Sequence, residues 1–206
     1  INRAGRNLLK DVYGDPRIST QELYGSGGNV LAHLVWFYGE TGLFNRRVGL
    51  HFGRLPVATE VAGSPLYCQF STLCSAPNTL KRETAFTVWP KSNWGIAATV
   101  RPALDDHFTI GVFDSNPNYG GPSGWSWFDG QNRGVLVPME HVWQPYIGPH
   151  GLVGHYKIGY AVDTARYAPL SRPLAHGRMR HTWWVEVDQM LWRTGALDTS
   201  GVILFG

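Results

Sequence analysis

Two acidic side chains, Glu186 and Asp188, stand two positions apart in a stretch whose alternating pattern is typical of a β-strand. Side chains two apart lie on one face of a strand, about 6 to 7 Å from each other. Carboxyl groups at about this separation can act as acid and base in glycoside hydrolysis. The simpler interpretation is that both face water on a polar strand face. It is favoured because the sequence shows no neighbour that would give the two groups different roles.

Two further motifs were weighed as ligand sites. His150 and His155 are five positions apart, but a metal site needs a third ligand and a fixed geometry, and the flanking Gly and Pro residues favour a turn. The Gly-rich run from Tyr24 to Gly28 lacks the Lys and Ser/Thr of a phosphate-binding loop, so it also predicts a turn. The sequence therefore predicts neither a metal ion nor another cofactor.

Aromatic side chains alternate with polar ones in the stretch from Ser115 to Asp129, which contains Tyr119, Trp125 and Trp127. Such rings can stack on the flat faces of sugars while amides and carboxylates accept hydrogen bonds from the hydroxyl groups. Alternatively, the rings anchor the loop or mark a membrane interface. Both interpretations remain open at this point.

The two cysteines, Cys68 and Cys74, lie in a second loop that also carries Tyr67 and Phe70. Their spacing fits a small disulfide-closed loop in an oxidising compartment better than a metal site, which would need four ligands. A pair of reduced thiols is the alternative.

The composition bounds the class of protein. The 206 residues include 25 Gly and 9 Trp, and only 16% are charged, against about 25% in typical soluble domains. The formal net charge is only +3, and the basic residues form no continuous stripe, so nucleic-acid binding is not expected. No apolar run approaches the roughly 18 residues that a membrane-spanning helix needs. Abundant Gly, Pro, Val, Thr and aromatic residues predict an all-β chain.

Runs with a period of two position the candidate residues on strands. The predicted strands are Val30 to Glu40, Arg46 to Leu55, Trp94 to Arg101, His107 to Asp114, Arg133 to Trp143, Gly154 to Thr164, Thr182 to Arg193, and Gly201 onward. The connections between them alternate between short and long. This rhythm is typical of an up-and-down barrel whose longer loops gather at one end, although a soluble sandwich can show it too.

One face of most predicted strands is apolar and the other is polar or small, as in Trp94, Ile96, Ala98 and Val100 against the residues between them. Trp and Tyr residues stand at or near strand ends, as expected of the aromatic girdles of a membrane barrel. Two strands fit poorly. The first is apolar on both faces, and Pro138 interrupts the fifth, which predicts a bulge or an edge position there.

Several motifs together resemble the carbohydrate-selective porins of the OprB family. They are Ser64 to Phe70 with Cys74 beyond, Phe108 to Pro117, Gly154 to Tyr160, and Asp188-Gln189 followed by Leu191 to Arg193. The resemblance runs from about Leu31 to Phe205. It implies a multi-pass β-barrel of the bacterial outer membrane that admits small sugars by passive diffusion, in contact with lipid and as a homotrimer. Porins have about 16 strands, so the resemblance implies a single barrel domain, residues 1–206, that is incomplete at both ends.

On this resemblance, the long segment from Pro56 to Asn93 is expected to fold into the lumen as a constriction, pinned by Cys68 and Cys74. The wall opposite would line the pore and contact glucose-type mono- or oligosaccharides through Arg47, His51, Arg101, Lys157, Glu186 and Asp188. These groups would set selectivity without breaking bonds. The alternatives are a soluble carbohydrate-binding β-sandwich and a glycoside hydrolase that uses Glu186 and Asp188.

Overall fold

The computed structural model describes residues 34–64, 66, 80, 84–88, 91–115, 124–125, 134–166, 177, 179–195 and 201–206. Its elements are β1 (Phe37–Leu43), β2 (Val48–Leu55), η1 (Val57–Thr59), β3 (Asn93–Ala103), β4 (Asp106–Asp114), β5 (Val135–Trp143), β6 (Tyr146–Ile147), β7 (Leu152–Asp163), β8 (Arg180–Arg193) and β9 (Gly201–Phe205). A strand is present at each predicted place, but β1 is shifted toward the C-terminus of the predicted Val30 to Glu40, since residues 34–36 are not in a strand. The short β6, which pairs with β7, was not predicted.

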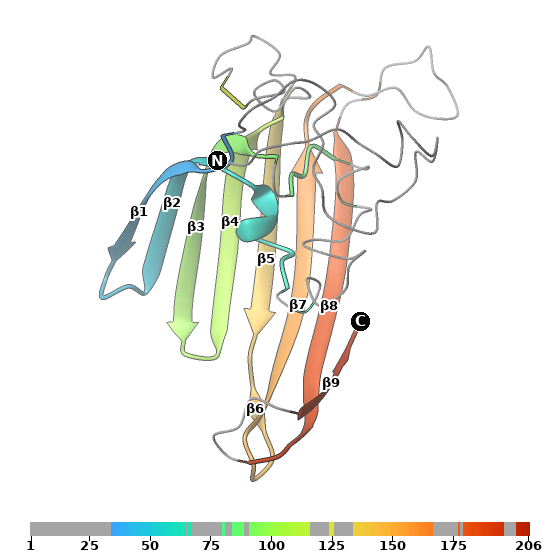
Figure 1. The fold of residues 1–206 in the computed structure, drawn as a ribbon. Coiled ribbons are helices and arrows are strands. Elements are labelled where there is room, and N and C mark those ends of the chain that lie inside the picture. The colour runs from blue at the N-terminus through green and yellow to red at the C-terminus, as the bar shows by residue number, and fades with distance from the viewer. Residues whose placement is uncertain are drawn as a thin grey trace, which may run out of the picture.

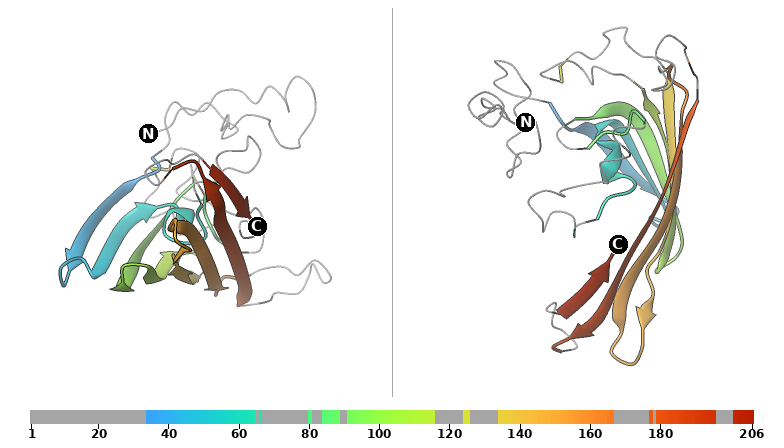
Figure 2. Two further views of the ribbon diagram at one scale, coloured as in Figure 1. Left: turned by 90° about the horizontal axis from the view of Figure 1, so that it is seen from below. Right: turned by 90° about the vertical axis from the view of Figure 1, so that its right-hand side faces the viewer.

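The strands form one antiparallel sheet in which each main strand pairs with the next along the chain, in the order β1-β2-β3-β4-β5-β7-β8-β9. Figure 1 shows this up-and-down arrangement, with short turns at one end of the sheet. The sheet bends into an arc, and η1 lies on its concave side (Figure 2). Among the described strands, β1 and β9 are the two edges of this arc, so the sheet is not closed. The predicted all-β, up-and-down architecture is thereby confirmed for an incomplete barrel wall.

The turn between β1 and β2 differs from the prediction. The strands pair as far as Leu43 and Val48, and the turn comprises residues 44–47. Phe44, Asn45 and Arg46 have φ between 52° and 63°, so three successive left-handed residues reverse the chain. Period-two counting placed the turn three residues earlier because nothing in Phe or Arg signals a positive φ. Arg47, predicted within a strand, therefore lies in the turn.

The expected bulge or edge position at Pro138 was wrong. Its strand β5 is central, between β4 and β7. Pro138 pairs in register with Ala161 of β7, and the β4–β5 ladder keeps one register on either side of it, from Ile110↔Met139 to Phe113↔Leu136. Since proline lacks only the N–H, the sheet accommodates it by leaving out ladder pairs rather than by shifting register.

The predicted alternation of faces is confirmed by burial. Ile96 and Val100 of β3, Phe108 and Ile110 of β4, and Ile158 of β7 are exposed on the convex side. The residues between them point to the concave side and are small, polar or buried. No helix in the described residues is long and apolar enough to cross a membrane.

Candidate functional site

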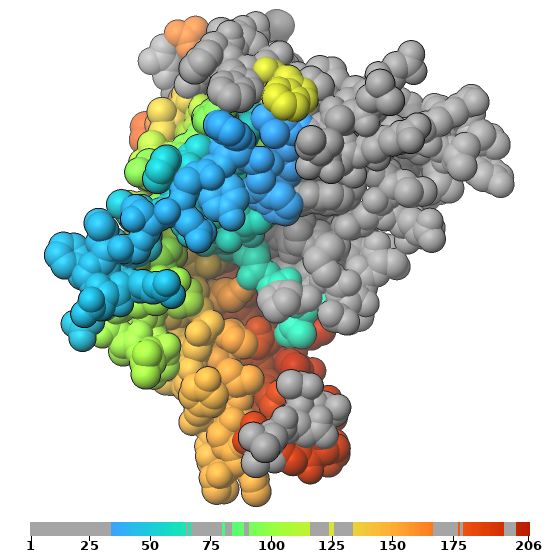
Figure 3. Space-filling view, turned by 60° about the vertical axis from the view of Figure 1, so that its left-hand side comes forward, coloured from blue at the N-terminus to red at the C-terminus, as the bar shows by residue number. Residues whose placement is uncertain are grey.

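The concave face of the sheet carries a folded-in segment that we call the insert, defined as residues 56–64 and 84–88. Its two limbs are joined by Thr87, whose Oγ accepts a hydrogen bond from the Val57 amide (3.1 Å) and whose carbonyl accepts one from the Ala58 amide (2.9 Å). In the space-filling view, teal atoms of the first limb lie between the blue atoms of β1 and β2 and the orange atoms of β7 (Figure 3). The start and end of the predicted constriction segment thus lie inside the arc.

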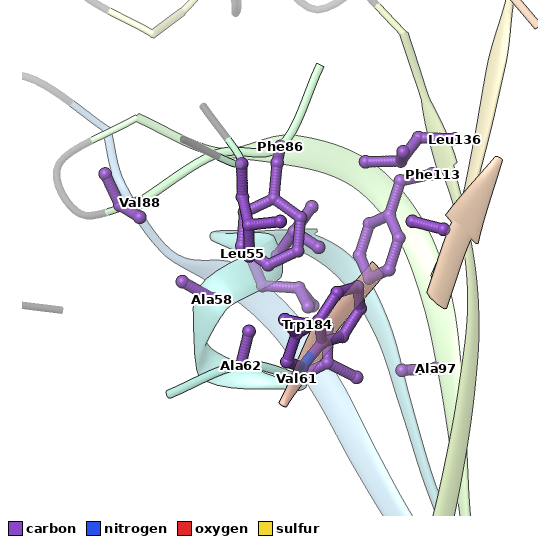
Figure 4. Close-up of a cluster of buried hydrophobic side chains, with 13 residues drawn as sticks. Leu55, Ala58, Val61, Ala62, Phe86, Val88, Ala97, Phe113, Leu136 and Trp184 are labelled. Carbon is purple, nitrogen blue, oxygen red and sulfur yellow. The ribbon is translucent and has the colours of Figure 1, made fainter. Parts of the chain in front are cut away.

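Apolar side chains pack the insert against the wall. Figure 4 shows Ala58, Val61, Phe86 and Val88 of the insert in one cluster with side chains of the sheet, which are Leu55, Ala97, Phe113, Leu136 and Trp184. The rings of Phe86 and Trp184 meet edge to face, with centroids 6.0 Å apart. The concave face is therefore not wholly polar. Where the insert covers it, the wall is a hydrophobic core.

A buried carboxylate ties the first limb to the wall. Glu140, in the middle of β5, is 5% exposed. Its Oε2 accepts hydrogen bonds from the Ala62 amide (2.8 Å) and from the Trp184 indole nitrogen (2.7 Å). Both donors are buried, and a buried N–H without an acceptor is unfavourable. This single oxygen atom therefore connects β5, β8 and the insert.

An ion pair lies beside it. Lys157 of β7 donates a hydrogen bond to Glu186 of β8 (3.1 Å) and another to the carbonyl of Gly63 in the insert. The side chains of Lys157 and Glu186 are only 10% and 7% exposed. Both residues were predicted to line the pore on the wall opposite the constriction. In the structure they lie directly beneath it.

The second limb has its own buried partner. Asp163, at the end of β7, is fully buried and accepts hydrogen bonds from the Ala85 amide (2.8 Å) and the Ser115 hydroxyl (2.9 Å). It also pairs with Arg180 at the start of β8. Asp163 therefore fixes the insert and the start of the 115–134 connection at the same rim of the sheet.

At the other side of the insert, His51 of β2 lies between two carboxylates. Its Nδ1 is 2.9 Å from Glu60 Oε2 in the insert, and its Nε2 is 3.8 Å from Glu40 Oε2 of β1. The side chains of His51 and Glu40 are 40% and 68% exposed, so this edge of the insert presents polar groups to the hollow of the arc. The ring of Tyr38 lies 6.0 Å from that of His51.

The remaining predicted residues lie elsewhere. Asp188 of β8 pairs with His155 of β7 at 2.6 Å. Arg101 is exposed at the end of β3 that meets the β1–β2 turn, where its amide donates to the Arg47 carbonyl (2.8 Å). Trp125 is 53% exposed. The predicted residues outside the described part of the chain are Tyr67, Cys68, Phe70, Cys74, Tyr119 and Trp127.

Each acid of the suspected hydrolytic pair has a basic partner on β7, Lys157 for Glu186 and His155 for Asp188. Of the two histidines weighed as metal ligands, His155 pairs with Asp188, and His150 accepts a hydrogen bond from Arg193 through its backbone carbonyl. In the described ranges, no three His, Cys, Asp or Glu side chains come together in a way that could hold a metal ion. The arrangement is one of fixed, paired charges around a folded-in segment.

Sequence reasoning did not single out Glu140, Asp163, Trp184 or Glu60. A signal was present for Glu140, because it is the only charged side chain on the inward positions of β5. No such signal existed for its partners, since the Ala62 amide and the insert position depend on contacts between segments 78 residues apart.

The chain matches over residues 1–206 the protein family described as "Carbohydrate-selective porin, OprB family". It is 26% identical over 220 residues to Porin B of Pseudomonas aeruginosa, an alignment that covers 98% of this chain and 48% of that protein. It also resembles the high-pH structure of Pseudomonas putida OprB, with 25% identity, a TM-score of 0.78, and coverage of 98% of this chain and 51% of that one. The chain thus spans about half the length of these relatives.

Proposed function

Because this chain belongs to the carbohydrate-selective porins of the OprB family, we propose that the protein forms a water-filled pore for the passive diffusion of small sugars. Its described strands are part of the wall of an outer-membrane β-barrel. The observation that carries the proposal is the insert, which is packed and hydrogen-bonded on the concave face of that wall. A segment in this place narrows the lumen, and a narrow lumen can select among solutes.

The groups at the edge of the insert suit weak contact with sugar hydroxyls. His51 and Glu40 are partly exposed beside Glu60, Arg101 lies further along the same face next to Gly49, and Arg47 is exposed in the short turn beyond. Such donors and acceptors replace the water that a sugar gives up, loosely enough for the sugar to leave. Asp188 and His155 extend this polar surface, whereas Lys157 and Glu186 contribute by supporting the insert.

We further propose that the pore performs no bond-breaking chemistry. The burial of Glu186, which is 5% exposed beneath the insert, supports this, because an acid or base in hydrolysis must lie within reach of the substrate. The exposed apolar positions of β3, β4 and β7 support contact with outer-membrane lipid. The homotrimer that the family resemblance implies is part of the same proposal.

The test is a vesicle-swelling assay on the complete protein reconstituted in liposomes. We expect glucose-type mono- and oligosaccharides to enter faster than uncharged non-sugar solutes of similar mass, at rates that rise with the amount of protein. Vesicles that swell no faster than protein-free ones would contradict the proposal. Incubation with a panel of glycosides checks the second part, since release of product that is lost in Glu186→Gln would identify a hydrolase instead.

A further inference from the structure

We propose that Glu140 is the positioning residue that holds the first limb of the insert at the depth that sets the aperture of the pore, acting through Ala62 and Trp184. The inference rests on the proposed porin function. It assigns a role to a residue that touches no solute, since Glu140 is 5% exposed and lies behind the insert.

One oxygen atom of Glu140 accepts both of the hydrogen bonds that this carboxyl group makes to the insert and to Trp184. Oε2 of Glu140 accepts from the Ala62 amide at 2.8 Å and from the Trp184 indole at 2.7 Å. The Ala62 amide needs an acceptor from elsewhere in the chain, because Ala62 is fully buried and stands outside the sheet and η1. Without Glu140, a buried N–H would lose its partner, which is unfavourable.

Trp184 links the same Glu140 oxygen to the apolar cluster between the insert and the wall. Gly159 pairs with Trp184 across β7 and β8, and a Cβ at Gly159 would lie 2.0 Å from the Trp184 ring. The ring therefore occupies the space that a side chain would take, and it meets the ring of Phe86 in the second limb edge to face. The bond to Glu140 fixes the ring in that position, so both limbs depend on the same carboxylate.

Glu140 differs from the other anchors of the insert, Asp163 and Lys157, in how few other hydrogen bonds it makes in the described part of the chain. Asp163 holds Ala85 but is shared with Ser115, Ala165 and Arg180, so its loss would disturb the rim of the sheet as well. Lys157 divides its hydrogen bonds between Gly63 and the buried Glu186, so its loss would also leave a carboxylate of the wall without its partner. Within the described residues, the hydrogen bonds of Glu140 go to the insert and to Trp184, so its removal acts on the insert most directly.

The experiment compares variants of the complete protein in planar bilayers and by hydrogen exchange. Glu140→Ala removes the acceptor, Glu140→Gln keeps one acceptor oxygen, and Trp184→Phe removes the indole N–H but keeps most of the ring. Met139→Ala is the matched control, because Met139 is the adjacent residue on β5 and points to the convex side. Heat-modifiable migration on gels reports whether each variant folds.

We expect the fraction of time that Glu140→Ala spends in a larger-conductance level to be about tenfold or more that of wild type, as for buried N–H groups that lose their acceptor. Its preference for sugars over size-matched solutes should fall, and amides of residues 57–63 should exchange faster. Glu140→Gln and Trp184→Phe should give intermediate changes, and Met139→Ala none.

Folded Glu140→Ala that matches Met139→Ala in conductance levels, sugar preference and exchange would overturn the proposal. Should Glu140→Ala fail to fold, unchanged behaviour of both Glu140→Gln and Trp184→Phe would overturn it equally. Failure of the porin function is distinguishable, because wild type would then show no sugar-permeable channel. Faster exchange of residues 57–63 in Glu140→Ala would still support the anchoring role in that case, and unchanged exchange would refute it.

Discussion

Charged side chains at inward positions of this wall are covered by the insert in one part of the sheet and partly exposed in another. Glu140 and Lys157 are buried by the insert, whereas His51 and Glu40 on the same face remain partly exposed. Residues of one chemical type on one face of a sheet thus divide into supporting and solute-facing groups according to what covers them. The division decides which substitutions affect stability and which affect selectivity.

Gly159→Ala tests whether the Trp184 ring is fixed in place behind the insert. A Cβ at Gly159 would meet the Trp184 ring at 2.0 Å, and that ring is held by Glu140, so it cannot move aside without breaking its bond. We expect a loss of about 1 to 3 kcal/mol in the free energy of unfolding, as for overpacked cores. Urea titration of the complete protein in lipid vesicles measures it.

Gly49→Ala is the control for this substitution. Gly49 also faces the concave side, but the nearest atom to its added Cβ is the end of the Arg101 side chain at 3.4 Å. It should cost well under half as much. Equal losses for the two alanine variants would mean that Trp184 is not fixed in place.

At the residue scale, the sequence supported the choice of face but not the choice of role. Alternation placed His51, Lys157, Glu186 and Asp188 on one face of the sheet, and they lie together on its concave side. It could not show that the insert would cover Lys157 and Glu186. The insert is distant from both residues in sequence and has no regular apolar repeat that would predict its contacts. The error at Arg47 is similar in kind, since its turn depends on backbone conformation rather than on residue type.

At the scale of elements, the strands were predictable because each satisfies its backbone and its apolar face by the same two-residue repeat. The extent of β1, the turn after it and the β6 hairpin were not, because hairpin geometry and pairing decide them. The insert lies between these cases. Its length and position between β2 and β3 could be predicted, and its contacts could not.

The two faces of β7 provide a second prediction. Ile158, 60% exposed on the convex side, is replaced by Arg, and His155, which points to the concave side, is replaced by Arg as the matched change on the same strand. Ile158→Arg should reduce the free energy of folding into a bilayer by about 2 to 4 kcal/mol, as for a cation on the lipid face. His155→Arg can keep an ion pair with Asp188 and should cost much less. The reverse order would contradict the assignment of faces.

The hydrogen bond between Val57 and Thr87, which joins the two limbs of the insert, can be removed without a change of shape. Thr87→Val keeps the shape of the side chain but removes the oxygen that accepts from the Val57 amide at 3.1 Å. We expect exchange at Val57 to accelerate about tenfold, as for one lost hydrogen bond with a buried donor. Exchange at strand amides such as those of β8 serves as the internal control and should not change. Unaltered exchange at Val57 would show that the packing alone joins the limbs.

At the scale of the whole molecule, the described sheet is an open arc with β1 and β9 at its edges, and the chain covers about half of the relatives it matches. Edge strands expose unpaired backbone groups, which a membrane barrel must pair by closure. We predict that the 206-residue chain on its own forms no stable monomeric channel, whereas the complete protein does. Size-exclusion chromatography in detergent with conductance on the same fractions checks this, and a conducting monomer of the short chain would contradict it.

We propose that this wall and its insert belong to a sugar-selective pore. Single-channel recording of the complete protein with increasing concentrations of glucose-type sugars is the sharpest test. We expect discrete conductance steps whose current falls with sugar concentration until the effect saturates, as sugar enters the constriction, and a weaker effect of non-sugar solutes of the same size. Absence of conductance steps, or steps that respond to sugars and other solutes alike, would contradict it.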